Sequence, residues 1–109
     1  MIALALLLAQ AGLPPPAPVV TAASGLQETY LRKCAFCHAE DGTGNTKKGK
    51  KLRVPDFTSA KWQQHTSDDE MTGIIEKGNP KRKMPAFKDK LTPQQIQALV
   101  PYLRSFATK

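Results

Sequence analysis

The residues best suited to chemistry in this chain stand together in the run Cys34-Ala35-Phe36-Cys37-His38. Two thiols three residues apart on a helix lie close together on one face, where they can add to the two vinyl groups of one porphyrin. His38 follows at once, so its imidazole falls beneath the iron and can bind it. The run contains both cysteines of the chain and one of its two histidines. This spacing predicts covalent attachment of one c-type haem, with His38 as an iron ligand.

Two other uses of the same residues fit the sequence less well. A redox-active Cys-x-x-Cys pair is typical of a βαβ context, and no segment of this chain has the alternating pattern of a strand. A zinc site would require further cysteines or histidines at ligand spacing, and only His65 remains outside the run. Covalent haem attachment is therefore the favoured interpretation.

A haem iron in an electron carrier needs a sixth ligand, and Met84 is the predicted one. Met84 lies in a loop rather than in a helical stripe, and Pro85 stiffens the segment that presents its sulfur. A thioether ligand favours ferrous iron and raises the reduction potential. Met71 is an alternative, although it stands in step with the isoleucines that follow it, as in a buried helix face. His65 is a second alternative, in a polar stretch without a rigid neighbour.

The first residues of the chain resemble a secretory leader. A short apolar block over residues 2–8 is followed by small residues and a proline-rich segment, with processing points at Ala9-Gln10-Ala11 or just after Ala23. No Lys or Arg precedes the apolar block, so an uncleaved, weakly anchoring tail is the alternative. We predict a signal peptide over residues 1–23, a single haem domain over residues 24–109, and export to the periplasm.

Composition limits the chain to one small globular domain. Hydrophobic residues make up 40% and charged residues 23% of its 109 residues, which excludes a disordered tail. No apolar run reaches the roughly 20 residues that a membrane span needs, and the chain is too short for a two-domain nucleotide-binding enzyme. A domain of this size buries a low fraction of its surface, so we expect a bound cofactor to supplement its core.

The elements that must position these residues are predicted to be helices. The spacing of apolar residues predicts a first helix from about Gly25 to Cys37. Glycines and lysines from Asp41 to Lys51 predict an exposed loop. Because no segment alternates with a period of two, the predicted fold class is all-α.

Two further helices have clear start signals. Ser67 precedes three acidic residues, which favour a helix N-terminus, and that helix is expected to end before Gly78. Thr92 precedes a proline at the first position of the closing helix. Pro101 lies inside this last helix and predicts a kink rather than an end, because the apolar stripe continues beyond it.

Sixteen Lys and Arg against nine Asp and Glu give the chain a net charge of +7. Such a balance favours an acidic partner. The basic residues form two clusters, and an exposed haem edge is expected beside the second, where its charges would steer the approach of that partner. Nucleic acid is a poorer fit, because aromatic residues are not interleaved with the basic ones. The first cluster is Lys47, Lys48, Lys50, Lys51 and Arg53, and the second is Lys81, Arg82, Lys83, Lys88 and Lys90.

These motifs together resemble the class I cytochromes c of bacteria, which are small soluble proteins with one haem ligated by His and Met. The resemblance covers residues 25–106, and the haem run and the methionine loop are its specific parts. It is carried by Tyr30, Cys34 to His38, Asp41-Gly42-Thr43-Gly44, Val54-Pro55-Asp56-Phe57, Trp62, Asp69-Glu70, Ile74, Gly78, Met84-Pro85-Ala86-Phe87, Leu91-Thr92 and Leu99 to Arg104.

The resemblance implies a cytochrome c-like fold of three to five short helices around one covalently bound haem. It implies that the first and last helices cross, with Tyr30 and Tyr102 near their contact. It also implies that the carbonyl of Pro55 accepts a hydrogen bond from His38, as groups behind a metal ligand often do. Trp62 is expected either to reach the haem or a propionate, or to serve as an ordinary core residue.

The expected function is transfer of single electrons between redox partners, with no catalysis of bond chemistry. The expected partners are acidic redox proteins such as a reductase, an oxidase or a dehydrogenase, and the expected state is a monomer without a stable membrane span. One alternative is a small haem subunit docked on a dehydrogenase or oxidase. A haem enzyme or gas sensor is a further alternative, although no distal acid–base pair is evident.

Overall fold

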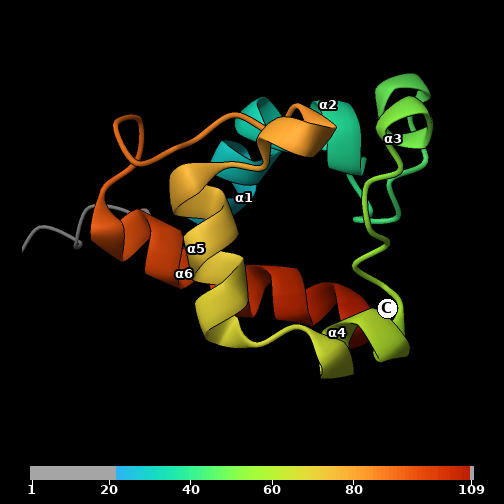
Figure 1. Ribbon diagram of the computed structural model, residues 1–109. Coiled ribbons are helices and arrows are strands. Elements are labelled where there is room, and N and C mark those ends of the chain that lie inside the picture. The colour runs from blue at the N-terminus through green and yellow to red at the C-terminus, as the bar shows by residue number, and fades with distance from the viewer. Residues whose placement is uncertain (1–21, 109) are drawn as a thin grey trace, which may run out of the picture.

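The computed structural model of the chain describes residues 22–108 and is built from short helices (Figure 1). The predicted leader lies outside the described residues, except for its last two positions. In the described part the only strand-like pairing is a single bridge between Asn79 and Met84, so the all-α prediction is confirmed. The helices are α1 (Ala22–Lys33), α2 (Ala35–His38), α3 (Lys47–Leu52), α4 (Ala60–His65), α5 (Asp68–Lys77), η2 (Pro80–Arg82), α6 (Pro93–Ser105) and η3 (Phe106–Thr108).

The predicted first helix is two helices in the structure, and its predicted limits are wrong at both ends. α1 begins at Ala22, and the chain leaves regular helix at Cys34, whose φ is −119°. The N–H of Cys37 then bonds the carbonyl of Cys34 at 3.2 Å, a tighter turn than in an α-helix. The haem run therefore occupies a separate short helix, α2, that begins anew after Cys34.

The segment predicted as an exposed loop contains the helix α3, which corrects that prediction. Thr46 caps it by accepting a hydrogen bond from the N–H of Gly49 at 2.8 Å. Gly49 packs directly against the carbonyl of Cys37, where a Cβ atom would have no room. Tertiary contact therefore stabilises a helix that the local run of lysines and glycine does not suggest.

The two helices with clear start signals form where they were expected. Ser67 caps α5 by accepting from the N–H of Glu70, and α5 ends at Lys77 before Gly78. Thr92 caps α6 in a reciprocal capping box with Gln95. α6 continues through Pro101 without ending, as predicted.

Aromatic residues join α1 to α6 at the centre of the core. Tyr30 and Phe106 are fully buried, and their ring centroids lie 5.2 Å apart. Tyr102 lies 5.3 Å from Tyr30, which confirms the contact implied by the resemblance. The hydroxyl of Tyr30 donates to the carbonyl of Ala39 at 2.7 Å and so ties α1 to the residue after the haem run. In Figure 1, α3 and α4 lie on one side of the molecule and are joined by an extended segment.

Candidate haem site

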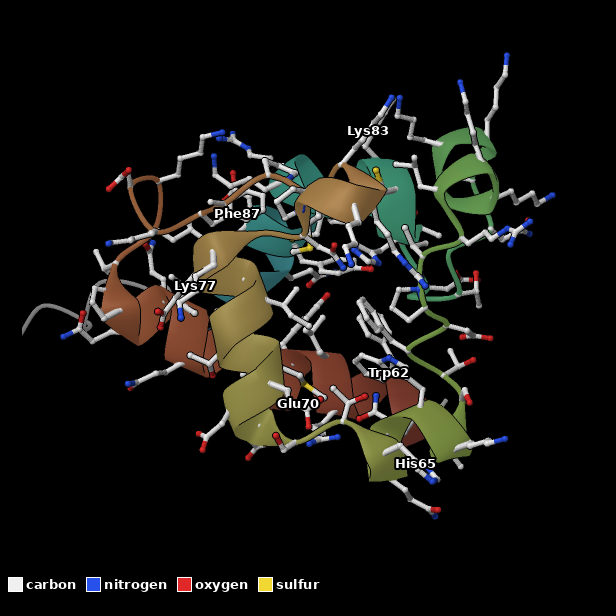
Figure 2. All side chains as sticks on the ribbon, viewed as in Figure 1. Trp62, His65, Glu70, Lys77, Lys83 and Phe87 are labelled. Atoms are coloured by element: carbon white, nitrogen blue, oxygen red, sulfur yellow. The ribbon has the colours of Figure 1, made fainter. Side chains whose placement is uncertain are left out.

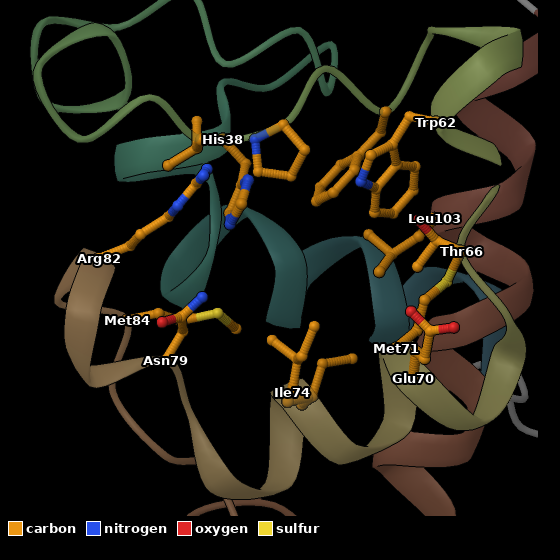
Figure 3. A pocket seen from close by; sticks show the side chains of 14 residues that line it. His38, Trp62, Thr66, Glu70, Met71, Ile74, Asn79, Arg82, Met84 and Leu103 are labelled. Atoms are coloured by element: carbon orange, nitrogen blue, oxygen red, sulfur yellow. The ribbon is translucent and has the colours of Figure 1, made fainter.

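A cavity of about 360 Å³ lies between the extended segment before α4, the helix α5 and the segment around η2 (Figure 3). Apolar side chains of Ile74, Ile75 and Leu103 form much of its wall. His38 lines it from one side and Met84 from another. A mostly apolar cavity with a nitrogen donor and a sulfur donor suits a large planar ligand that contains a metal.

His38 presents a buried and unsatisfied nitrogen. Its Nδ1 has no hydrogen-bond partner among the described residues, and its ring stacks on Phe57 with 4.6 Å between centroids. Burial lowers the pKa of the His38 imidazole to about 4, which favours the neutral form that binds metals. The hydrogen bond expected from His38 to Pro55 is not formed in this structure, although Pro55 lines the same cavity.

The two cysteines lie beside His38 at a smaller adjoining cavity. Cys34 and Cys37 are half-buried free thiols, and burial raises the pKa of the Cys34 thiol to about 11. The smaller cavity, of about 50 Å³, is lined by both cysteines and also by His38 and Met84. All four residues predicted from the sequence to hold a haem therefore meet at one place.

Backbone contacts hold Met84 at the cavities. Asn79 and Met84 exchange two hydrogen bonds, each with an N–O distance of 3.0 Å, which close a tight turn around η2. Gly78 has a φ of +74°, and a Cβ atom there would lie 2.6 Å from the Met84 carbonyl oxygen. The methionine segment thus folds closely onto the end of α5 because residue 78 has no side chain.

The structure also places the two alternatives to Met84. Met71 is buried on α5 and lines the larger cavity, but not the smaller one that contains the cysteines. His65 is exposed at the end of α4, with its Nδ1 2.8 Å from the Lys61 carbonyl oxygen. Figure 2 shows His65 at the outer edge of the molecule, pointing away from the cavity. Met84 is therefore better placed than either alternative.

Trp62 lines the larger cavity from α4. Its ring lies 4.9 Å from that of Phe57. Among the described residues, Nδ1 of His38 is the buried side-chain polar atom without a hydrogen-bond partner, and Trp62 lines the same cavity. The residues present therefore fit a haem, a group with an apolar ring and polar propionates.

Two arginines support the site in ways that the sequence did not reveal. The guanidinium of Arg104 donates to the carbonyl oxygens of Gln63 and Thr66 at 2.6 and 2.7 Å, which fastens α6 to the cavity wall around Trp62. Arg82 donates to the carbonyl of Arg53 at 2.6 Å and links η2 to the segment after α3. All three bonds join distant parts of the chain, so no local motif could have indicated them.

Comparison with known proteins agrees with this site. The family model described as cytochrome C oxidase, cbb3-type, subunit III matches residues 21–103. The solved structure titled KustC0563 c-type cytochrome is 41% identical, with a TM-score of 0.69, and the match covers 73% of this chain and 94% of that one. A mutant of Kustc0563 with phenylalanine in place of tyrosine is 40% identical, with a TM-score of 0.68, over 74% of this chain and 96% of that one.

The fold and the site define a small mono-haem cytochrome c. The chain belongs to the family of c-type cytochrome domains whose model is described as subunit III of cbb3-type cytochrome c oxidase. Its cofactor is covalently bound haem c, which contains iron. Proteins of this family take part in haem-based electron transfer and generally carry electrons rather than catalyse reactions. No helix among the described residues is long and apolar enough to cross a membrane.

Proposed function

We propose that this protein carries single electrons between redox partners through one haem c. In this proposal Cys34 and Cys37 would form the two thioether bonds, and His38 and Met84 would bind the iron. The supporting observation is that these four side chains line one small cavity, although Met84 is far from the other three in the sequence.

The residues of the chain set the conditions for electron transfer. The haem supplies an iron that exchanges one electron between its ferric and ferrous forms. His38, kept neutral by burial, and Met84, whose backbone is held by its turn with Asn79, would bind the iron. The soft thioether of Met84 favours the ferrous form and so raises the reduction potential. Apolar groups such as Ile74 and Leu103 line the cavity and would keep water away from a bound haem.

We propose that its partners are acidic redox proteins, which it meets as a monomer after export to the periplasm. Lys33, Arg82 and Lys83 line the smaller cavity beside the cysteines and Met84, so basic groups border the place where haem would approach the surface. Cations at that position attract an acidic partner and orient it for electron transfer.

A second candidate function is that of a haem subunit docked on an oxidase or dehydrogenase. The observation that favours it is the matched family model, which is described by a subunit of an oxidase. A free carrier elutes from a sizing column at the mass of one chain when it is purified from its source, whereas a subunit elutes with the larger complex.

Covalent attachment and a protected iron are the tests of the proposal. In acid–acetone extraction the haem colour should remain with the polypeptide, and Cys34→Ala should leave at most one thioether bond and lower the yield of haem protein. The ferrous protein should not bind carbon monoxide readily, because Met84 occupies the sixth position. Haem that leaves with the solvent contradicts covalent attachment, and rapid turnover of peroxide by the unmutated protein contradicts the carrier function.

A further inference from the structure

Arg82 bridges two segments of the haem site that lie far apart in the sequence. Its guanidinium donates to the carbonyl of Arg53 at 2.6 Å, across 29 positions of sequence. Figure 3 shows its side chain leaving η2 and extending toward His38. Among the described residues, those that line both cavities of the site are His38, Val54, Arg82 and Met84. Arg82 therefore shares the centre of the site with the two proposed ligands of the iron.

The carbonyl that accepts this hydrogen bond is held in a fixed position. Arg53 follows α3 with a φ of +55°, in the left-handed region that residues with a side chain disfavour. The N–H of the next residue, Val54, donates to the carbonyl of Gly49 at 3.1 Å. Gly49 itself packs against the carbonyl of Cys37. The acceptor is therefore fastened to the haem run.

The methionine segment, residues 79–91, is attached on its other side to α5. In the described part of the chain, its backbone hydrogen bonds run within the segment or to α5, as when the N–H of Phe87 donates to the carbonyl of Ile75 at 2.9 Å. Lys83, the residue before the methionine, has a left-handed φ of +59°. A residue with a side chain adopts this conformation only at a cost in free energy. The segment therefore needs a further attachment to keep its turn closed, and the side chain of Arg82 provides one.

We propose that Arg82 is a positioning residue that fastens the methionine segment to the haem run and so keeps the Met84 sulfur at the haem site. The inference rests on the proposed function, in which His38 and Met84 bind the iron. Without the hydrogen bond from Arg82 the segment stays attached to α5 alone, and the thioether leaves the iron more often. Because Arg82 is exposed, its replacement does not disturb the apolar core.

Imidazole tests this role, because it competes with a methionine for the sixth position of a ferric haem. Its affinity is measured from the loss of the weak far-red band of a sulfur-ligated haem as imidazole is added to the haem protein. The variant is Arg82→Met, which keeps a long side chain and removes its donors and its charge. Lys81→Met is the control for charge, because Lys81 is exposed in the same turn. Ile96→Val is the control for stability, because Ile96 is buried on α6 and lines neither cavity.

We expect Arg82→Met to raise the affinity of the ferric protein for imidazole about three- to tenfold, since the loss of one hydrogen bond shifts an equilibrium by about that factor. Carbon monoxide should bind to the ferrous form of this variant faster by a similar factor. Lys81→Met should change the imidazole affinity far less. Ile96→Val should lower the free energy of unfolding, measured in urea, and leave the imidazole affinity unchanged.

A double variant shows whether Arg82 acts through the methionine. In Met84→Ala the sixth position is already open, so adding Arg82→Met should leave the imidazole affinity, measured there from the main haem band, unchanged. An equal rise in affinity with and without Met84, or no rise in Arg82→Met, overturns the role of Arg82 but leaves the carrier function standing. If the unmutated ferric protein lacks the far-red band, the proposed ligand Met84 is wrong, and the inference about Arg82 fails with it.

Discussion

At the scale of single residues, the site combines the imidazole of His38 with the thioether of Met84, and the two reach the cavity in different ways. His38 follows the cysteines directly, so its position could be predicted from the sequence alone. Met84 comes from the other half of the chain, and it reaches the same cavity because Gly78 and Asn79 hold its backbone. The methionine itself could be predicted from the rigid segment around it. The turn that aims it could not, because it depends on a close approach between Gly78 and the Met84 carbonyl.

Replacement of the thioether tests the role of Met84. In Met84→Ala we expect loss of the weak far-red charge-transfer band of a sulfur-ligated ferric haem, a lower reduction potential, and binding of carbon monoxide to the ferrous iron. The measurements are absorption spectra and a redox titration. Met71→Leu is the control and should keep the band, since Met71 is a buried core residue and leucine preserves its volume. An unaltered spectrum and potential in Met84→Ala would show that another residue binds the iron.

Tyr30 predicts how stability depends on alkaline pH. Burial raises the pKa of its phenol well above the usual range, so the folded protein retains a proton that the unfolded chain loses above about pH 10. The unfolded state then binds fewer protons than the folded state, and the free energy of unfolding falls as the pH rises.

Tyr30→Phe should remove this part of the alkaline fall. It should also lower the free energy of unfolding at neutral pH by about 0.5–1.5 kcal/mol, because the carbonyl of Ala39 loses the phenol hydroxyl and keeps the N–H of Gly42 as its donor. Urea unfolding at several pH values between about 8 and 11 measures both effects. An alkaline slope equal to that of the unmutated protein would contradict the assignment to Tyr30.

At the scale of elements, the helices with strong local signals were predictable and the others were not. The caps Ser67 and Thr92 and the apolar stripes behind them correctly predicted α5 and α6. α3 was missed because its lysines and Gly49 read as a loop, whereas its stability comes from Thr46 and from packing on the Cys37 carbonyl. α4 was missed because it is short and polar, although Ser59 caps it by accepting from the N–H of Trp62.

Gly78 and Gly73 form a matched pair for testing the junction between α5 and the methionine segment. Gly78→Ala forces a side chain into a left-handed conformation against the Met84 backbone, so we expect a loss of about 1–3 kcal/mol in unfolding free energy and a weaker sulfur-to-iron band. Gly73→Ala lies inside α5, where a Cβ atom meets nothing within 4 Å. That variant should gain about 0.5–1 kcal/mol and leave the spectrum unchanged. Equal effects of the two substitutions on the spectrum would contradict a positioning role for Gly78.

At the scale of the whole molecule, charge and long-range contacts are the main features. The net charge of +7 and the two basic clusters were visible in the sequence. Their arrangement was not, because the first cluster is placed beside Cys37 by α3 and the second lies around Met84. The same limit applies to Arg104, whose partners Gln63 and Thr66 lie far from it in the sequence.

Salt and charge reversal test whether the residues around Met84 steer a partner. Lys81 and Lys88 are exposed, so reversing both to Glu should slow reduction by an acidic protein such as flavodoxin about tenfold at low salt, with the haem spectrum and potential unchanged. Rising salt should reduce the difference, since charges are screened beyond about 8 Å at physiological ionic strength. Lys61→Glu, on the exposed face of α4, is the control. If the rate of reduction changes neither with salt nor with the charge reversal, this cluster is a solvated surface without a steering role.

The fastening of α6 by Arg104 has a consequence for the order in which the protein matures. The cysteines and His38 lie within one short run, whereas Arg104 reaches Gln63 across 41 positions of sequence. Contacts between distant residues form more slowly than local ones, because the intervening loop must first close. We therefore expect the thioether bonds to need only the region of α1 and α2, with docking of α6 coming afterwards. The haem would then be attached while the side of the cavity formed by α6 is still open. The hydrogen bonds of Arg104 would form afterwards and close the cavity to solvent.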